Sequence, residues 1–228
     1  MIVLFDLDGT VLTFSDAPPG PGRTAMDRAV KELFGLDGAS TGVRFSGGTD
    51  RAIARALLRK AGVRDEAIEG HVEPFLATYL KHLQDELSRR KYRPVGDVAT
   101  AARTLRERGV CVGIATGNTR PGARLKLASA GLEGSFDLDR GGYGCDAEAR
   151  ADILRAAVGR CAPHAREGAS VVVVGDTLHD VAAARAIGAK VVGVAETAAA
   201  RRELEDAGAD VVVDDCGPAI VSAIDSFS

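Results

Sequence analysis

Tryptophan is absent from this sequence, and aromatic residues make up only 4% of it. Proteins that bind single-stranded nucleic acids stack the bases on aromatic side chains, and this chain has few of them. An excess of positive charge is missing as well, since 29 lysine and arginine residues stand against 32 acidic ones, a net charge of −3. Because this balance gives no attraction to a phosphate backbone or an anionic lipid surface, we expect no nucleic acid and no membrane as partner.

Long apolar runs are also missing. No stretch reaches the roughly 18 apolar residues that a membrane-spanning helix needs. The apolar start MIVLF ends at Asp6, before the core of a signal peptide can form. The four cysteines show no CxxC spacing, so we interpret them as buried or idle reduced thiols. These absences predict a cytoplasmic protein.

The 228 residues are 46% hydrophobic and 27% charged, which is typical of a globular protein of one or two domains. Five short runs consist mainly of β-branched or small apolar residues, as buried parallel strands require. They are Ile2–Phe5, Val110–Ala115, Val171–Val174, Lys190–Val194 and Val211–Val213. Several are separated by the helical patterns Val98–Arg108, Arg124–Ala130 and Val181–Ile187. This alternation predicts an α/β fold with a doubly wound parallel sheet, like a Rossmann fold.

One interval breaks the alternation. Between the first strand and Val110, apolar residues at spacings of three and four predict helices at Thr24–Phe34, Thr49–Ala61 and Asp65–Arg89. We therefore expect an α/β core formed by residues 1–14 and 94–228, with an inserted helical cap formed by residues 15–93. The alternative, in which these helices pack on the sheet as part of one domain, stays open.

Polar residues follow three of the predicted strands directly, in the segments FDLDGT, ATGN and VVGDTLHD. The carboxyl ends of parallel strands form the ligand crevice of an open α/β sheet, so these segments are expected at one edge. Asp6 and Asp8 are two residues apart, and side chains with this spacing on a strand point the same way. Two carboxylates in one crevice need a counter-ion, and Mg²⁺ with oxygen ligands supplies it.

Residues after the second and third of these strands complete the expected site. Asp176 and Asp180 are four residues apart, so we expect them on one face of the first turn of a helix, toward the metal. Asp176 is expected to bind the metal, and Asp180 to bind it or to orient its ligands. Thr116 offers a hydroxyl beside the backbone N–H groups of the following turn, and together they can converge on a phosphate oxygen.

The segments DLDGT at 6–10, TGN at 116–118 and GDTLHD at 175–180 resemble motifs one, two and four of the haloacid dehalogenase superfamily. The helical insert is similar to the cap of the first type in that superfamily, and the most similar subgroup is that of phosphoglycolate-phosphatase-like hydrolases. The resemblance implies that Asp6 is a nucleophile that becomes an aspartyl-phosphate. It also implies that the carbonyl of Asp8 joins the metal ligands, while its side chain acts first as general acid and then as base. The substrate- or phosphate-binding positions that it implies are Leu7, Gly9, Thr10, Gly117 and Asn118.

The third motif of the superfamily departs from its usual form, because no lysine lies between Asp137 and Val171. Arg150, near the start of a helix predicted to run to Cys161, is the candidate replacement, since its permanent charge can neutralise the nucleophile and a phosphate. The rival cations are Arg140, Arg155 and Lys126.

Several functions share this core. A dehalogenase needs neither Asp8 nor the metal-side acids, and a phosphonate hydrolase needs a cap lysine, for which Lys31 and Lys60 are the candidates. A phosphoryl mutase uses the same residues as a phosphatase, whereas a non-catalytic phospho-receiver needs no cap. The sequence favours a Mg²⁺-dependent phosphatase for a small phosphomonoester. The substrate and the oligomeric state stay open.

Residues of the cap are expected to choose the substrate. The candidates are Phe45, Gly47, Thr49, Asp50 and Arg51. Arg44 or Arg51 can grip a substrate carboxylate, although each is also typical of a solvated surface charge.

Overall fold

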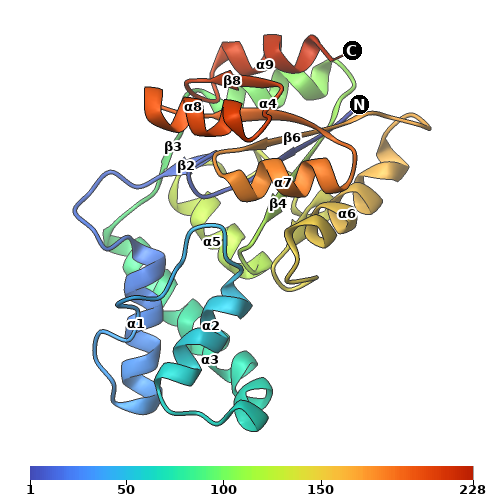
Figure 1. The fold of residues 1–228 in the computed structure, drawn as a ribbon. Coiled ribbons are helices and arrows are strands. Elements are labelled where there is room, and N and C mark those ends of the chain that lie inside the picture. Colours follow the sequence, from blue (N-terminus) through green and yellow to red (C-terminus); the bar gives the residue numbers. More distant parts are fainter. Residues whose placement is uncertain (228) are drawn as a thin grey trace.

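A parallel sheet lies at the centre of the computed structural model, which describes residues 1–227 (Figure 1). Its six strands have the order β5–β4–β1–β6–β7–β8. They are β1 (Ile2–Phe5), β4 (Cys111–Thr116), β5 (Gly142–Tyr143), β6 (Val171–Gly175), β7 (Lys190–Val194) and β8 (Val211–Val213). The chain winds outward from β1 through β4 to β5 and then returns to the other side of β1 with β6. The doubly wound α/β fold is thus confirmed, and its ligand crevice is expected where the winding reverses.

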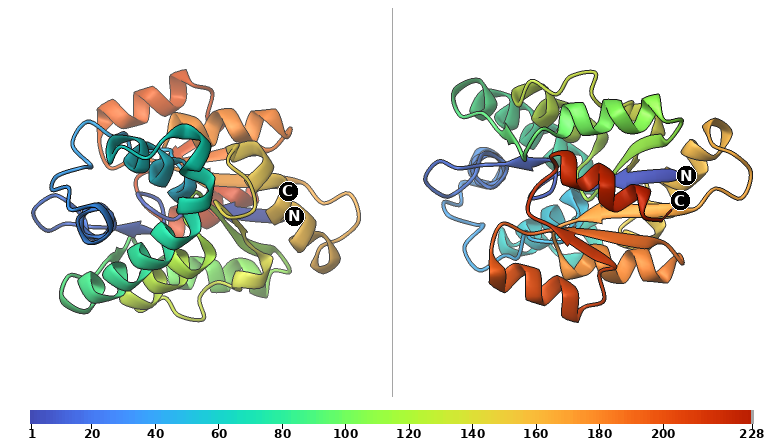
Figure 2. Two further views of the ribbon diagram at one scale, coloured as in Figure 1. Left: turned by 90° about the horizontal axis from the view of Figure 1, so that it is seen from below. Right: turned by 90° about the horizontal axis from the view of Figure 1, so that it is seen from above.

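Helices cover both faces of this sheet (Figure 2). One face carries α4 (Val98–Glu107), α5 (Arg120–Ser129) and α9 (Pro218–Asp225), and the other carries α6 (Arg150–Cys161), α7 (Leu178–Ala186) and α8 (Ala198–Asp206). Short 3₁₀ helices lie at Leu138–Arg140 and Ala162–His164. In β1, Val3 and Phe5 pack toward the first face, whereas Ile2 and Leu4 pack toward the second. Side chains alternate along a strand, so a strand covered on both faces must be apolar throughout.

The strands predicted from the sequence are confirmed to within a residue at each end, but three predicted helix starts are wrong. Helix α1 begins at Pro21 rather than Thr24. Helix α5 begins at Arg120 rather than Arg124, and α7 begins at Leu178 rather than Val181. The threonines before them, Thr119 and Thr177, accept hydrogen bonds from backbone N–H groups of the first turn. Each helix therefore starts with a polar turn, and apolar spacing detects a helix only after that turn.

The insert between β1 and β4 is helical, as predicted. It contains α1 (Pro21–Phe34), α2 (Asp50–Lys60) and α3 (Asp65–Arg89), which pack on one another at one end of the molecule (Figure 1). Two short strands that were not predicted, β2 (Leu12–Thr13) and β3 (Arg93–Pro94), pair antiparallel where the chain enters and leaves the insert. Helix α3 also packs on α5 of the sheet layer. No helix in the described part of the chain is long and apolar enough to cross a membrane.

We expect the central strand to carry much of the stability. Leu4→Ala removes a fully buried side chain and should lower the free energy of unfolding by about 2–5 kcal/mol, measured by urea denaturation. Leu33→Ala makes the same chemical change on α1 where the side chain is 42% exposed, and should stay within about 0.5 kcal/mol of the wild type. Equal effects of the two substitutions would contradict this distribution of stability.

Candidate active site

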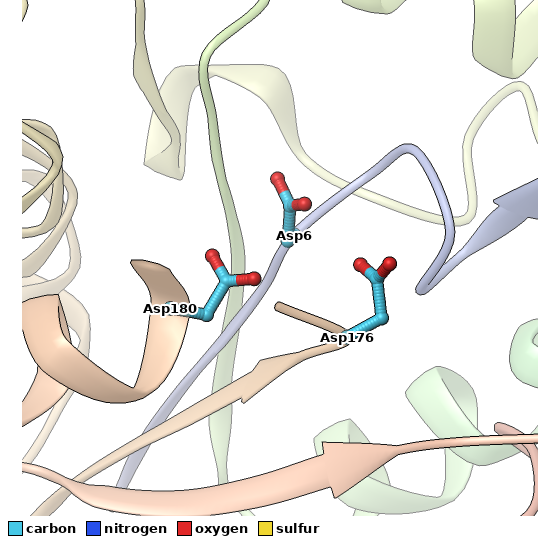
Figure 3. A group of neighbouring side chains, drawn as sticks. All are labelled: Asp6, Asp176 and Asp180. Carbon is cyan, nitrogen blue, oxygen red and sulfur yellow. The ribbon is translucent and has the colours of Figure 1, made fainter. Parts of the chain in front are cut away.

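The register of the sheet brings two acidic strand ends together. Phe5 of β1 pairs with Val174 of β6, so Asp6 and Asp176 emerge at the same edge. Asp180 joins them from the first turn of α7, and one carboxylate oxygen from each aspartate lies within 4.8 Å of those of the other two (Figure 3). The edge at which the sequence placed the site therefore holds an acidic cluster of these three residues.

Asp180 reaches this cluster by a route that the sequence did not predict. Asp176 precedes α7, so the expectation that it shares the first helical turn with Asp180 is wrong. Instead, Asp180 turns back toward the strand end, where its Oδ2 accepts hydrogen bonds from the hydroxyl of Thr177 at 2.6 Å and from its backbone N–H at 3.1 Å. This pairing forms a capping box at the start of α7. The geometry favours the expected orienting role for Asp180.

The turn after β1 fits closely around Asp176. Gly9 has a φ of +90°, and a Cβ at this position would lie 2.2 Å from Oδ2 of Asp176. The hydroxyl of Thr10 donates a hydrogen bond of 2.8 Å to Oδ1 of Asp176. Only glycine leaves room for the carboxylate in this conformation, so Gly9 and Thr10 act on the site through Asp176.

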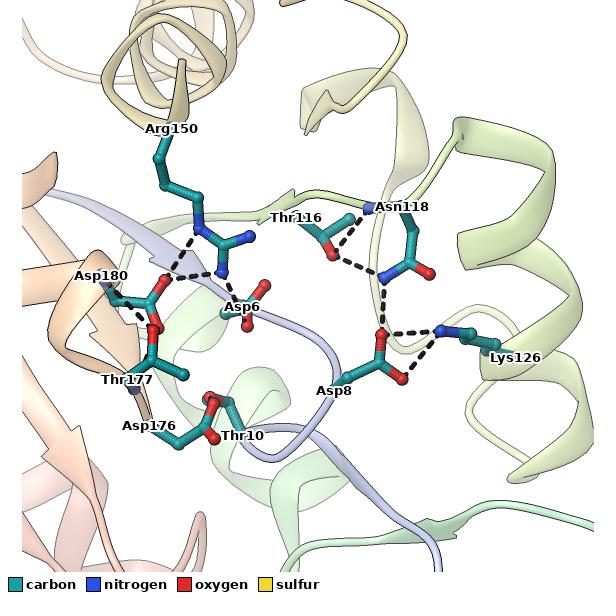
Figure 4. A network of polar contacts seen from close by, with 10 residues as sticks. All are labelled: Asp6, Asp8, Thr10, Thr116, Asn118, Lys126, Arg150, Asp176, Thr177 and Asp180. Carbon is teal, nitrogen blue, oxygen red and sulfur yellow. Dashed lines mark hydrogen bonds and ion pairs between the residues drawn. The ribbon is translucent and has the colours of Figure 1, made fainter. Parts of the chain in front are cut away.

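Arg150 lies against the acidic cluster, as expected for the replacement of the missing lysine. Its Nη2 is 2.9 Å from Oδ2 of Asp6 and 2.6 Å from Oδ1 of Asp180, and its Nε donates to the same Asp180 oxygen at 3.0 Å (Figure 4). The side chain is only 13% exposed. The rivals Arg140 and Arg155 pair with aspartates of their own segments, three residues away.

Asp8 is held apart from the acidic cluster by Lys126, the third of the rival cations. Lys126 of α5 donates hydrogen bonds of 2.9 and 2.7 Å to the two oxygens of Asp8, and the side-chain amide of Asn118 donates another of 2.7 Å to Oδ2 (Figure 4). Burial acts to raise the pKa of Asp8, but the charge of Lys126 and these hydrogen bonds lower it overall. Only the backbone carbonyl of Asp8 is thus left for the metal role that the resemblance implies. Lys126 and Asn118 hold the carboxylate itself, and its acid–base role stays a prediction.

The sequence placed Lys126 only as a substitute for Arg150, so its pairing with Asp8 was missed. A signal for its burial was present, because Lys126 lies three residues after Ala123 and four before Ala130, on the apolar face of the helix that also holds Leu127.

The turn after β4 is tightly built. The hydroxyl oxygen of Thr116 accepts hydrogen bonds from the side-chain amide of Asn118 at 2.8 Å and from its backbone N–H at 3.3 Å. A Cβ on Gly117 would lie 2.4 Å from the carbonyl oxygen of Gly48 in the insert. The structure therefore brings the predicted Thr116, Gly117 and Asn118 to the site, with the insert pressed against the middle residue.

These residues open into a cavity of about 360 Å³ between the sheet edge and the insert. Asp6, Asp8, Asp176 and Arg150 line one end. The insert contributes residues of which only Phe45, Gly47 and Asp50 were singled out from the sequence; the others are Gly20, Gly22, Arg23, Met26, Ser46, Gly48, Ile53, Tyr79 and Tyr92. The missed residues lie on or just before α1, in the loop before α2, on α2, on α3 and after α3. The spacing of Met26, Ile53 and Tyr79 indicated core packing and gave no sign of a ligand.

The remaining candidates for substrate selection lie elsewhere. Arg51 pairs with Glu73 inside the insert, Arg44 lies 3.2 Å from the ring of His179, and Thr49 caps α2. None of the three lines the cavity. A grip on a substrate carboxylate by Arg44 or Arg51 is therefore not supported by this arrangement.

The three carboxylates of the acidic cluster share one arginine, so the cluster is short of positive charge. Burial raises the pKa of Asp6 to about 8 even beside Arg150, and burial together with Asp180 raises the pKa of Asp176 to about 6. Oδ1 of Asp6 is buried and finds no hydrogen-bond partner among the described residues. Leu7 has a buried side chain and contributes only a backbone hydrogen bond to Asp6. Carboxylate oxygens short of partners fit a hard divalent cation such as Mg²⁺.

Fold and site together define a class of protein. It is a doubly wound α/β protein whose sheet edge carries an acidic cluster backed by one arginine, with a set of inserted helices over the cavity. A sequence model of the family described as haloacid dehalogenase-like hydrolase matches residues 1–188, which include all three motif segments. The chain belongs to this family.

Solved structures show the same fold. A predicted phosphatase from Clostridium acetobutylicum has a TM-score of 0.69 and 17% identity, with 99% of this chain and 98% of that chain covered. A hydrolase from Pseudomonas syringae has a TM-score of 0.67 and 19% identity at the same coverage. A candidate β-phosphoglucomutase from Thermotoga maritima has a TM-score of 0.62 and 20% identity, with 100% and 99% covered. No curated protein sequence matches the chain significantly.

The buried charge of Asp6 leads to a test in the absence of metal. Its pKa is raised from 3.8 to about 8 on folding, so the folded state binds the proton more tightly and stability should fall as the pH rises between these values. Asp6→Asn should remove the part of this dependence that Asp6 contributes, above all between pH 6 and 8 where Asp176 no longer titrates, and at pH 7.5 with a chelator raise the free energy of unfolding by about 1–3 kcal/mol. Urea denaturation at several pH values measures both effects.

The control is Asp37→Asn, because Asp37 is 74% exposed and pairs with Lys31 at the surface. That variant should resemble the wild type. A metal-free Asp6→Asn protein that is less stable than the wild type would show that the Asp6 carboxylate stabilises the fold.

Proposed function

We propose that this protein is a Mg²⁺-dependent phosphatase that hydrolyses a small phosphomonoester through an aspartyl-phosphate on Asp6. The observation that carries the proposal is the free oxygen of Asp6. Its Oδ2 is held by Arg150, whereas Oδ1 has no partner among the described residues and Asp6 lines the cavity. A carboxylate fixed through one oxygen and free at the other is suited to attack phosphorus.

In the first half-reaction, Oδ1 of Asp6 forms a bond to phosphorus as the bond to the leaving oxygen breaks. The leaving oxygen takes a proton from the Asp8–Lys126 pair, which lies on the leaving-group side of the cavity. Lys126 holds both Asp8 oxygens, so the acid is fixed before the substrate arrives. The products of this step are an alcohol and the aspartyl-phosphate.

In the second half-reaction, a water molecule attacks the same phosphorus and the bond to Asp6 breaks. The Asp8 carboxylate takes the proton of the water, which restores the pair to its starting state. The lowered pKa of Asp8 favours this base role, because the carboxylate form is the one that accepts a proton. Inorganic phosphate and the free Asp6 carboxylate remain.

Charge compensation accompanies both steps. When bound by Asp6 and Asp176, with the carbonyl of Asp8, Mg²⁺ would neutralise the phosphoryl oxygens and the acidic cluster. Arg150 supplies a fixed positive charge beside Oδ2 of Asp6. Thr116 offers its hydroxyl proton to the phosphoryl group, because its oxygen already accepts a hydrogen bond from Asn118.

We further propose that residues 15–93 act as a cap that selects the leaving group and excludes water. Cap closure over an aspartyl-phosphate protects it until the alcohol has left. A phosphonate hydrolase is less favoured by the arrangement, because Lys31 pairs with Asp37 and Lys60 donates to the carbonyl of Thr41, so neither lines the cavity. A phosphoryl mutase keeps every residue of this mechanism and differs only in what attacks the aspartyl-phosphate.

A screen of phosphate esters tests the proposal, with para-nitrophenyl phosphate as reference and released phosphate as readout. Activity should vanish in a chelator and return with Mg²⁺. A phospho-enzyme trapped by acid quench should map to Asp6 by peptide mass spectrometry, and Asp6→Asn should yield none. Full activity in chelator, or a phosphoryl group on another residue, would refute the mechanism. Stimulation only by a sugar bisphosphate, without release of phosphate, would identify a mutase.

Arg150 provides a second test. Loss of its charge-assisted hydrogen bonds should lower kcat/KM of Arg150→Ala by about ten- to a hundred-fold. Arg150→Lys keeps the charge without the fork, so it should recover part of the loss. Arg155→Ala, on the same helix but paired at the surface with Asp152, serves as control and should match the wild type. A nearly unchanged Arg150→Ala would assign the charge-compensating role to another group.

A further inference from the structure

The start of helix α5 is held by a residue of the cap. Asp50, the first residue of α2, accepts a hydrogen bond of 2.7 Å from the backbone N–H of Thr119 through Oδ2. Its own backbone N–H donates to the carbonyl oxygen of Gly117 at 2.8 Å. Asp50 therefore contacts the turn after β4 on both sides of Asn118, with its side chain and its main chain. The residue is only 6% exposed.

A carboxylate suits this position for physical reasons. The backbone N–H groups at a helix start have no partner within the helix, and the helix dipole makes that end positive. Thr119 satisfies one of these groups, the N–H of Gly122, with its own hydroxyl, but its backbone N–H depends on Asp50. Packing fixes the contact further, because a Cβ on Gly122 would lie 3.4 Å from Oδ2 of Asp50 and 3.7 Å from Leu80 of the cap.

The segment that Asp50 holds supplies both side chains that bond to the Asp8 carboxylate among residues 1–227. Asn118 belongs to the turn itself, and Lys126 lies on α5 two helical turns further on. A shift or fraying at the start of α5 would therefore change the orientation of both residues that hold the Asp8 carboxylate. Asp50 itself makes no hydrogen bond to Asp8 in the described chain, so its structural effect on Asp8 passes through this segment, beside the longer-range effect of its charge on Lys126.

We propose that Asp50 is the positioning residue through which the cap orients Asp8. The proposal rests on the proposed function for its effect on turnover. With the cap in the observed position, Asp50 fixes the start of α5, and Asn118 and Lys126 then hold Asp8 toward the leaving group. With the cap displaced, the N–H of Thr119 loses this partner, and Asn118 and Lys126 hold the Asp8 carboxylate less firmly. The acid–base residue is thus set only when the cap covers the cavity.

Amide hydrogen exchange resolved at Thr119 tests the contact directly. Asp50→Ala should speed exchange there by at least about ten-fold, while amides of β1 and β4 keep their rates. Asp50→Asn retains an acceptor oxygen without the charge and should fall between. Asp65→Ala is the matched control, since Asp65 is also the first residue of a cap helix but pairs with Arg59 at the surface. Unchanged exchange at Thr119 in Asp50→Ala overturns the proposal, whatever the protein's activity.

Kinetics with para-nitrophenyl phosphate test the consequence. Asp50→Ala should lower kcat by about ten- to a hundred-fold with KM within about three-fold of the wild type, because the loss affects chemistry rather than binding. Asp50→Asn should recover part of kcat, and Asp65→Ala should match the wild type. A raised KM with unchanged kcat would make Asp50 a substrate-binding residue and overturn the proposal. Urea denaturation of each variant separates these effects from unfolding.

The two arms distinguish failure of this proposal from failure of the proposed function. An inactive wild type refutes the phosphatase, yet the exchange rate of Thr119 still decides whether Asp50 holds the start of α5. An active wild type with an unaffected Asp50→Ala enzyme leaves the phosphatase standing and removes the positioning role.

Discussion

Mutual repulsion among carboxylates is the constraint around which this site is organised. Three aspartates, Asp6, Asp176 and Asp180, converge beside Asp8 at the edge of one sheet, and like charges this close raise the free energy of the fold unless cations compensate them. The protein supplies two cations from opposite helical layers. Arg150 serves Asp6 and Asp180, while Lys126 serves Asp8. Division of the positive charge in this way separates the proposed nucleophile, Asp6, from the proposed acid–base group, Asp8, on the same strand end.

Compensation is incomplete at Asp6 and at Asp176, since the pKa of each is raised. Asp176 is bonded by the neutral hydroxyl of Thr10, and neither cation pairs with it. This leaves a deficit of positive charge around Asp176, on the side of the cluster away from Arg150. A divalent cation bound there would complete the charge balance, which is the physical reason to expect metal dependence from this family member.

Local sequence predicted the parts of this arrangement that depend on single segments. The buried strands, the helix Asp65–Arg89 and the helix from Arg150 to Cys161 follow from apolar spacing over short windows. The acidic strand ends follow from the rule that crevices form at carboxyl edges. The predictions that were incomplete concern contacts between residues that are distant in the sequence. The partner of Lys126 is 118 positions away, and the cap residues Tyr79 and Tyr92 show core spacing, so neither role is visible within one segment. The prediction of where α7 begins was wrong for another reason, since the residues of a capping box show no apolar spacing.

Helix α5 sets the distance between two parts of the site, the turn at Thr116–Asn118 and Lys126. Its start carries the turn at Thr116–Asn118, and Lys126 lies seven residues beyond the capping residue Thr119, about 10 Å along the axis of an ideal helix. Seven residues complete nearly two turns, so Lys126 lies on the same side of the helix as Thr119, the side of the turn that lines the cavity. One inserted or deleted residue within this stretch would rotate Lys126 by roughly 100° and remove it from Asp8. Length variation in this part of the chain is thus excluded by geometry, even where side chains on the outer face of the helix are free to change.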